Sequence, residues 1–254
     1  MTRRSRRSEA NPTGDMKTTP VSLGYARVWC TDRWGGVSAA PYDSANVGDH
    51  VEDDPGAVAT NRKLVADAAG LIEPTGWVWL SQVHGIHVHV ATEPTGPTPP
   101  EADASVTATR GLPLAILTAD CAPIALACDD AIGVVHAGHR GLDRGVIEAA
   151  VNALRDIGSG PVRAYLGPCI RPASYEFGVE DLARLVARFG SSVEGRTRDG
   201  RPAFDVPAAV HIALECCGVD AIADSGVCTA ESLDHFSFRR NGVTGRQVTI
   251  AVLP

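Results

Sequence analysis

Short apolar segments constrain the fold of this chain more than any other feature of its sequence. Residues 124–128 are apolar throughout, and residues 114–118 and 132–136 are nearly so. A strand with one solvated face alternates polar and apolar side chains, so continuous apolar runs indicate strands that are covered on both faces. Eight segments have the composition and length of strands: residues 25–30, 77–82, 86–90, 114–118, 124–128, 132–136, 162–166 and 248–253.

Helical signals lie between these strands. Asp54 precedes Pro55, and Gly70 follows an apolar stripe, which is the pattern of a helix with an N-cap, a proline near N1 and a C-terminal glycine. Covered strands together with amphipathic helices predict an α/β layered sandwich with a mixed sheet, whose strand order the sequence does not determine. Three further helices with one apolar face are expected at residues 146–158, 182–190 and 205–218, and loops at 93–100 and 195–201.

The chain is expected to form one domain. Its 254 residues show no internal repeat or change of composition that would divide them, and 44% hydrophobic residues suffice for a substantial core. The N-terminal stretch differs, because it is polar and carries a basic cluster of Arg3, Arg4, Arg6 and Arg7. We expect residues 1–20 to be a disordered tail and residues 21–254 to be a single catalytic domain.

Charge and hydropathy narrow the class of partner. The formal net charge of −7 disfavours nucleic acid, whose binding needs a clustered basic surface. No apolar run approaches the roughly 18 residues of a membrane span, and none follows the N-terminal arginines as it would in an export signal. Seven cysteines without a CxxC pair argue against a disulfide framework. We therefore expect a cytoplasmic protein with no nucleic-acid or membrane partner, present as a monomer or weak homo-oligomer.

Three polar segments interrupt the apolar strands where packing alone does not require them: residues 81–85, 118–123 and 135–141. Each begins or ends a predicted strand, and strand ends that meet at one edge of a sheet are the usual place for a site in α/β proteins. Taken singly, a His or Cys beside an apolar strand is better explained as part of the core. The combination of three such segments indicates a functional site instead.

The polar segments contain His84, Cys121 and His136, at separations of 37 and 15 residues. Zinc accepts imidazole nitrogen and thiolate sulfur, and a catalytic zinc site uses three protein ligands with a fourth position open to water or substrate. We therefore predict a zinc site at these three residues. Because their spacing matches no short zinc motif, only the fold can bring them together.

The same three segments resemble signatures of the YfiH-like laccase-domain family, whose members were once labelled multicopper polyphenol oxidases. Residues 31–38 and 41–48 are similar to the N-terminal signature of that family. Residues 228–247, which contain the sequences FSFRR and TGRQ, resemble its C-terminal signature. The resemblance covers roughly residues 25–250.

This resemblance implies a three-layer α/β/α sandwich with zinc held at the positions of His84, Cys121 and His136. It also implies reactions on purine nucleosides: phosphorolysis of adenosine, inosine, guanosine and methylthioadenosine with inorganic phosphate, and deamination of adenosine. Asp120 and Cys121 are the expected catalytic residues. In deamination, zinc lowers the pKa of a bound water while Asp120 shuttles protons. An equally good interpretation of Asp120 is a structural carboxylate that orients its loop or a ligand.

Phosphorolysis needs cations that bind phosphate in an otherwise acidic protein. Arg33, Arg140 and Arg239 lie in segments that resemble the family, and an arginine fork suits phosphate oxygens. Each is equally well explained as a solvated surface residue. Asn46 is a candidate for hydrogen bonding to the ribose or base, although an Asn in a turn next to glycine is usually there for its backbone conformation.

One position departs from the family pattern, because His139 stands where the family usually has Trp. We expect His139 to replace the aromatic side chain in packing, with ligation of the metal as the alternative. His87 and His89 face the same side of one predicted strand and are interpreted as a half-exposed face rather than a metal site. Cys169 is interpreted as structural rather than nucleophilic.

Three alternatives to nucleoside chemistry remain open. Related bacterial proteins resemble peptidoglycan editing factors that hydrolyse L-Ser from UDP-MurNAc-L-Ser, a substrate that needs a long cationic cleft rather than a compact, partly aromatic pocket. Copper-dependent polyphenol oxidation needs several coupled copper sites, and the eight histidines, with His50 and His211 scattered among them, form no obvious second cluster. A non-enzymatic, zinc-stabilised binding module conflicts with an open fourth ligand position.

Overall fold

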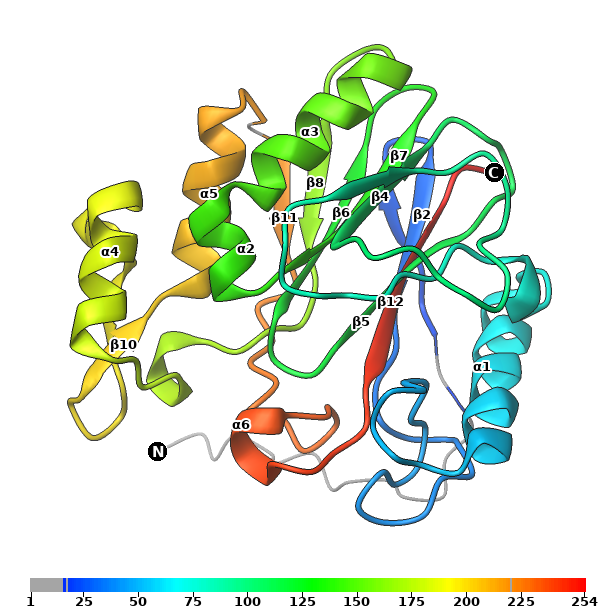
Figure 1. Cartoon of the computed structure of the whole chain (residues 1–254), viewed down its shortest axis with the longest axis horizontal. Helices are drawn as coiled ribbons and strands as arrows, with labels where there is room; N and C mark the ends of the chain where they lie inside the picture. The colour runs from blue at the N-terminus through cyan, green and yellow to red at the C-terminus, as the bar shows by residue number, and fades with distance from the viewer. Residues whose placement is uncertain (1–15, 17, 220) are drawn as a thin grey trace, which may run out of the picture.

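The computed structural model describes residues 16, 18–219 and 221–254. In this part of the chain two β-sheets pack face to face, and helices cover the outer side of each sheet (Figure 1). The α/β sandwich with a mixed sheet that the sequence predicts is confirmed. Its β layer is double, because a six-stranded and a four-stranded sheet lie against each other.

The larger sheet consists of β3 (Val88–Val90), β4 (Ala104–Thr107), β6 (Ala122–Ala127), β7 (Ile132–Ala137), β8 (Arg163–Leu166) and β11 (Ala221–Asp224). Its strand order is β11-β8-β6-β7-β4-β3. The two edge pairs are parallel and the inner pairs are antiparallel, so the sheet is mixed. Every residue of β6 and β7 is buried, which is why these segments are apolar on both faces.

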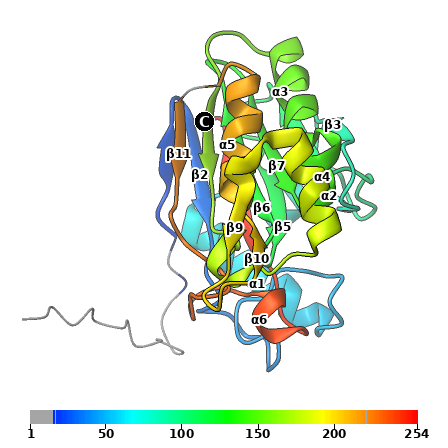
Figure 2. The ribbon, with the colours of Figure 1, turned by 90° about the vertical axis from the view of Figure 1, so that its left-hand side faces the viewer.

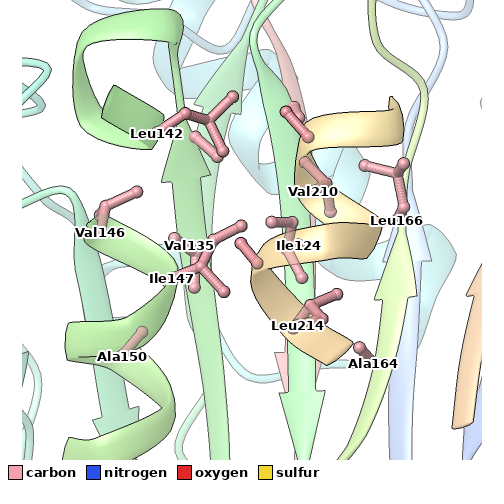
Figure 3. Packing of buried hydrophobic residues seen from close by; sticks show 14 of the residues in the cluster. Ile124, Val135, Leu142, Val146, Ile147, Ala150, Ala164, Leu166, Val210 and Leu214 are labelled. Carbon is pink, nitrogen blue, oxygen red and sulfur yellow. The ribbon is translucent and has the colours of Figure 1, made fainter. Parts of the chain in front are cut away.

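Three helices cover the outer face of the larger sheet: α2 (His139–Arg144), α3 (Val146–Ile157) and α5 (Val206–Cys216). A fourth helix, α4 (Val179–Phe189), packs on α2 and α5 farther from the sheet. Figure 3 shows Ile147 of α3 beside Val135, and Leu214 of α5 beside Ile124, in one buried cluster. A short hairpin of β9 (Glu194–Arg196) and β10 (Pro202–Phe204) lies next to α4, on the side that faces the viewer in Figure 2.

The smaller sheet consists of β1 (Val21–Leu23), β2 (Ala26–Cys30), β5 (Leu114–Thr118) and β12 (Gln247–Val252), in the order β1-β2-β12-β5. All its strand pairs are antiparallel. One face packs against the larger sheet, and the other is covered by α1 (Pro55–Ala69) and by two tryptophans. A last short helix, α6 (Phe238–Asn241), precedes β12, and 3-10 turns lie at Pro74–Gly76, Pro172–Ser174 and Ser191–Val193.

The caps that the sequence predicts for the first helix are confirmed. The Asp54 side chain accepts a hydrogen bond from the Ala57 N–H at 2.8 Å, and Gly70 ends α1 with a φ of 66°. Asp205 caps α5 in the same way by accepting from the Ala208 N–H at 3.0 Å. A carboxylate at an N-cap satisfies backbone donors that the helix itself leaves free.

The prediction of a strand over residues 77–82 is wrong. This segment pairs only through isolated bridges at Val78 and Ser81. The rings of Trp77 and Trp79 stack with centroids 5.4 Å apart, and each indole N–H donates to a nearby backbone carbonyl. The apolar character of the segment therefore reflects two anchored indoles in the core beside α1 rather than a ladder of backbone hydrogen bonds.

Smaller differences concern short elements. The predicted loop at 195–201 forms the turn of the β9–β10 hairpin, in which Arg196 pairs with Pro202. The strand expected at 86–90 is shortened to β3, and α2 and α6 were not predicted. Both of these helices are too short to show a periodic apolar stripe in the sequence.

The basic cluster of Arg3, Arg4, Arg6 and Arg7, and most of the expected tail, lie outside the described residues. The first strand, β1, begins at Val21. Among the helices of the described part, none combines the length and the apolar character needed to cross a membrane.

The central strand β6 provides a test of the packing. Ile124 is fully buried between β7, β8 and α5, so Ile124→Ala should lower the free energy of unfolding by about 2–5 kcal/mol, because it removes buried methyl groups and leaves a cavity. Ile72→Ala is the matched control, since Ile72 is 54% exposed, and its effect should stay within about 0.5 kcal/mol. Urea denaturation of both variants measures the difference, and equal losses would contradict the assignment of β6 to the core.

Candidate metal centre and cavity

Three potential metal-ligating side chains come together from three separate segments. His84 lies in the loop before β3, Cys121 in the turn between β5 and β6, and His136 in β7. Their donor atoms all lie within 4.8 Å of one another, and the Cys121 Sγ is 3.8 Å from the His84 Nε2. The imidazole rings of His84 and His136 meet edge to face, with centroids 4.7 Å apart. The structure thus brings together the three residues that the sequence pattern selects.

One fully buried carboxylate, that of Asp103, organises this cluster. It accepts hydrogen bonds from the backbone N–H groups of Val83, His84 and Gly85 at 3.2, 2.9 and 2.6 Å. It also accepts from the His136 Nδ1 at 2.8 Å, while the Asp103 carbonyl accepts from the His136 N–H at 2.7 Å. Asp103 therefore fixes the loop that carries one donor and the ring that provides another.

The hydrogen bond from His136 to Asp103 also decides which ring nitrogen can bind a metal. Burial raises the pKa of Asp103, but His136 and the backbone N–H groups outweigh this effect and lower it, so the carboxylate is ionised and can only accept. The Nδ1 of His136 must then carry a hydrogen, so Nε2 is the ring nitrogen that can bind a metal once its own proton is displaced.

The charges of the cluster favour a thiolate. Burial raises the pKa of the Cys121 thiol, but His136 and His84 beside it outweigh burial and lower the pKa to about 6. Burial lowers the pKa of His136, whereas Cys121 and Asp103 raise it, to about 9. A thiolate with two imidazoles is a donor set that suits zinc and other borderline-soft metals. These residues therefore fit a metal centre.

The three donors form part of the wall of a cavity of about 480 Å³. Two cationic side chains, Arg239 and Arg246, and two aromatic ones, Tyr175 and Phe238, contribute to the same wall. The guanidinium of Arg239 lies over the Tyr175 ring, 4.7 Å from its centroid. The remaining lining residues are His50, Gln82, Leu117, Thr118, Ala119, Asp120, Ala137, Gly138, His139, Ile170 and Val206.

Asp120 lines this cavity, and both of its carboxylate oxygens are engaged. Oδ1 accepts from the Thr229 hydroxyl at 2.6 Å, and Oδ2 accepts from the Arg239 backbone N–H at 2.6 Å. Its backbone φ of 111° lies in a region that non-glycine residues seldom adopt. Burial raises the pKa of Asp120, although the hydrogen bonds from Thr229 and Arg239 oppose that rise. The contacts connect the Cys121 turn to the segment that carries Arg239.

Of the four residues that the sequence pointed to for substrate binding, the structure brings only Arg239 to the cavity. Arg33 forms an ion pair with Asp43 at 3.1 Å, and Arg140 is exposed on α2. Asn46 is fully buried and accepts hydrogen bonds from the backbone N–H groups of Gly48 and Arg246, at 2.9 and 2.8 Å. Arg33, Arg140 and Asn46 therefore lie where they contact other parts of the protein or solvent, outside the cavity wall.

Sequence reasoning missed several residues of the site. Arg246 belongs to the TGRQ segment, so its position in a recognised motif was the available signal. Phe238 belongs to the FSFRR segment, so the same kind of signal was available for it, whereas Tyr175 stands in a segment with no distinguishing pattern. Asp103 lies in a short stretch before β4 that was not predicted to be a strand, and nothing in the sequence separates it from other acidic residues.

Three other predicted positions have defined places. His139 lines the cavity, with its Nδ1 3.5 Å from the Tyr175 hydroxyl and its ring edge-on to Phe177. Within the described residues it is not part of the metal-ligating group, and neither is the exposed His87. Cys169 is fully buried, which raises the pKa of its thiol, and it does not line the cavity.

Comparison with known proteins gives consistent matches along the chain. Residues 27–254 match a family model described as multi-copper polyphenol oxidoreductase laccase. A purine nucleoside phosphorylase of Streptomyces coelicolor is 50% identical over 222 residues, covering 85% of this chain and 90% of that protein. One from Streptomyces griseus is 46% identical over 236 residues, covering 91% and 95%.

Solved structures match over a similar length. YlmD from Geobacillus stearothermophilus superposes with a TM-score of 0.82 at 29% identity, covering 90% of this chain and 92% of that one. The hypothetical protein YfiH of Bacillus licheniformis gives a TM-score of 0.83 at 27% identity, covering 90% and 93%. The fold of the described chain is therefore one that has already been observed experimentally.

The role of Asp103 can be tested through metal affinity. In Asp103→Asn an NH₂ group replaces one acceptor oxygen, so at least one backbone N–H of the His84 loop, or the His136 Nδ1, loses its partner. We expect about 10- to 100-fold weaker metal binding, measured by competition with a chelator. The control is Asp156→Asn, which changes an exposed acid on α3 and should leave the affinity unchanged. Undiminished affinity in a folded Asp103→Asn variant would contradict this role.

Gly138 offers a steric test of the same centre. A Cβ at this position would lie 2.7 Å from the His84 Cδ2 and 3.3 Å from the Cys121 Sγ, although the φ of −75° suits any residue. Gly138→Ala should therefore displace the two donors and weaken metal binding at least about tenfold, which is the effect of mutating residues that orient metal ligands in other proteins. Gly178→Ala is the control, since a Cβ there meets no atom within 4 Å. Absorption spectroscopy of the cobalt-loaded proteins would reveal the change in ligand geometry. Identical spectra of Gly138→Ala and the unmodified protein would contradict the predicted displacement of the two donors.

Proposed function

This chain belongs to the multi-copper polyphenol oxidoreductase laccase family, and we propose its function from that membership. The proposed activity is phosphorolysis of purine nucleosides, with adenosine, inosine, guanosine and methylthioadenosine as substrates, accompanied by deamination of adenosine. The observation that carries the proposal is the 50% identity, over 85% of the chain, to a protein named purine nucleoside phosphorylase. The geometry of the cavity supports it independently.

The size and lining of the cavity suit a nucleoside. Its volume of about 480 Å³ falls within the range of small-molecule sites. Phe238 offers an aromatic surface against which a purine can stack, and the hydroxyl of Tyr175 adds a hydrogen-bonding group. A UDP-muramoyl peptide would need a longer cationic cleft, so the compact, partly aromatic lining supports the nucleoside over the peptidoglycan editing alternative.

Zinc is the metal that we propose for His84, Cys121 and His136, since a thiolate with two imidazoles matches its donor preferences. A zinc ion bound there supplies a Lewis acid in the cavity wall and makes a water molecule more acidic at neutral pH. Coupled copper chemistry needs several metal sites, whereas a single group of ligating side chains is found among the described residues. This count supports nucleoside chemistry over phenol oxidation.

The other residues of the site are proposed to bind and orient. Arg239 contributes a cation to the cavity, held in place because its guanidinium stacks on Tyr175 and donates to the Glu176 carbonyl at 3.0 Å. Asp120 holds the backbone of Arg239 and the turn of Cys121 together, since both its oxygens already accept hydrogen bonds. Of the two interpretations of Asp120, these contacts favour positioning over proton transfer.

Product analysis tests the proposed activity. Zinc-loaded protein incubated with adenosine or inosine should release free base and ribose 1-phosphate only when phosphate is present, and should convert adenosine to inosine without phosphate. Cys121→Ala removes a donor and should abolish both reactions, and metal removal by a chelator should do the same until zinc is restored. Chromatography with mass detection identifies the products.

The outcome of the same assay separates the alternatives. If no nucleoside is consumed under any condition, the proposal fails. Release of L-Ser from UDP-MurNAc-L-Ser by the same preparation would then assign the centre to amide hydrolysis. Oxygen consumption with a phenol after copper loading would assign it to oxidation.

A further inference from the structure

Arg246 is held rigidly at the wall of the cavity. Its backbone N–H donates to the buried Asn46 side chain at 2.8 Å, and its Nη1 donates to the carbonyls of Thr244 and Gly245 at 2.9 and 3.0 Å. The stem of the side chain passes close to Gly48, where a Cβ would lie 2.8 Å from the Arg246 Cγ. One edge of the guanidinium is thus fixed by backbone carbonyls, so its orientation is set before any ligand arrives.

The other edge of this guanidinium is free to bind. Nε and Nη2 of Arg246 have no hydrogen-bond partner in the part of the chain that the structure describes. Two other partly buried arginines are paired with carboxylates, Arg33 with Asp43 and Arg62 with Asp49. In Arg240 both Nη atoms donate to backbone carbonyls instead. Within the described residues, no carboxylate forms an ion pair with Arg246.

Nearby acidic groups do not neutralise Arg246. The charges of Cys121 and Asp120 act on Arg246 but are outweighed by its burial, so its pKa is lowered. Both oxygens of Asp120 already accept other hydrogen bonds. Arg239, the second guanidinium of the wall, also lacks a carboxylate partner among the described residues. Arg239 is exposed, whereas Arg246 is partly buried, and an unpaired, partly buried cation is costly unless a ligand supplies the missing negative charge.

We propose that Arg246, together with Arg239, binds the inorganic phosphate that serves as co-substrate. A guanidinium with two adjacent free donors presents the fork that matches two phosphate oxygens. This inference rests on the proposed phosphorolysis and extends it, because it assigns the anion to the two arginines that line the cavity and not to Arg33 or Arg140.

The reaction that this arrangement serves is balanced without a further reactant. A phosphate oxygen donates an electron pair to C1′ of the ribose, and the bond from C1′ to the purine nitrogen breaks. The base leaves with the electron pair of the broken bond and takes up the proton that the phosphate gives up, so the products are free purine and ribose 1-phosphate. The role of Arg246 is to hold the attacking phosphate beside the sugar, which lowers the entropic cost of bringing the two reactants together.

The test compares the zinc-loaded enzyme with Arg246→Gln, Arg246→Lys and the control Arg27→Gln, which removes an exposed arginine of β2. Phosphate and inosine are varied separately in initial-rate assays, and binding of inorganic phosphate alone is measured by calorimetry. Arg246→Gln should raise the KM and the Kd for phosphate by about 10- to 100-fold, because a charge-assisted pair is lost. The KM for inosine should change no more than about twofold, since Arg246 is assigned to the anion alone. The KM and the Kd for phosphate of Arg246→Lys should lie between those of the unmodified enzyme and Arg246→Gln, because lysine keeps the charge but lacks the two-pronged guanidinium.

The outcomes distinguish this inference from the proposed function. Normal phosphate dependence in folded Arg246→Gln, with turnover intact, overturns the inference and leaves the function standing. A different result is that the unmodified enzyme binds phosphate but consumes no nucleoside. If Arg246→Gln then abolishes phosphate binding, the anion site is supported and the proposed phosphorolysis is overturned. No phosphate binding by the unmodified enzyme overturns the inference. Zinc content and the unfolding temperature report whether Arg246→Gln is intact, and Arg246→Lys decides the question if it is not.

Discussion

The hydrogen bonds of one buried carboxylate hold this centre together. Asp103 lies just before β4, and β4 pairs with β7, so the carboxylate sits beside His136 by strand register. Three backbone N–H groups of the His84 loop then converge on the same two oxygens. A buried carboxylate is costly unless it is fully hydrogen-bonded. The hydrogen bonds from the His84 loop and the His136 ring therefore stabilise the ionised Asp103, and the same bonds fix the loop and the ring in place. The geometry of two metal donors is therefore coupled to the packing of the larger sheet.

The third donor depends on how the chain passes from one sheet to the other. β5 belongs to the four-stranded sheet and β6 to the six-stranded one, and Cys121 lies in the turn that joins them. This short crossing has an Asp120 with a φ of 111°, and hydrogen bonds from Thr229 and from the Arg239 backbone hold it there. The double β layer thus determines where the candidate site lies, because the three candidate donors and the cavity meet at the edge where the two sheets are connected.

The sequence could point to the three candidate donors but not to the residues that support them. His84, Cys121 and His136 interrupt apolar strands, and such interruptions are visible without a structure. Asp103 could not be recognised from the sequence, because its role depends on contacts with residues that lie 18 to 33 positions away along the chain. Arg33 and Asn46 lie in recognisable motifs but not in the wall of the cavity, so a motif marks a position without saying whether it touches a ligand.

Net charge is a poor guide to the chemistry of this cavity. The chain carries a formal charge of −7, which speaks against polyanion binding over the whole surface, and the cavity nevertheless gathers Arg239 and Arg246 beside a metal-ligating group. Local arrangement overrides the total because interactions between exposed charges are screened within about 8–10 Å at physiological salt, whereas partly buried groups are screened much less. Acidic residues elsewhere on the surface therefore cannot satisfy an arginine that is enclosed in the wall. An anion that enters the cavity meets two oriented guanidinium groups, so an acidic protein can still contain a site for phosphate.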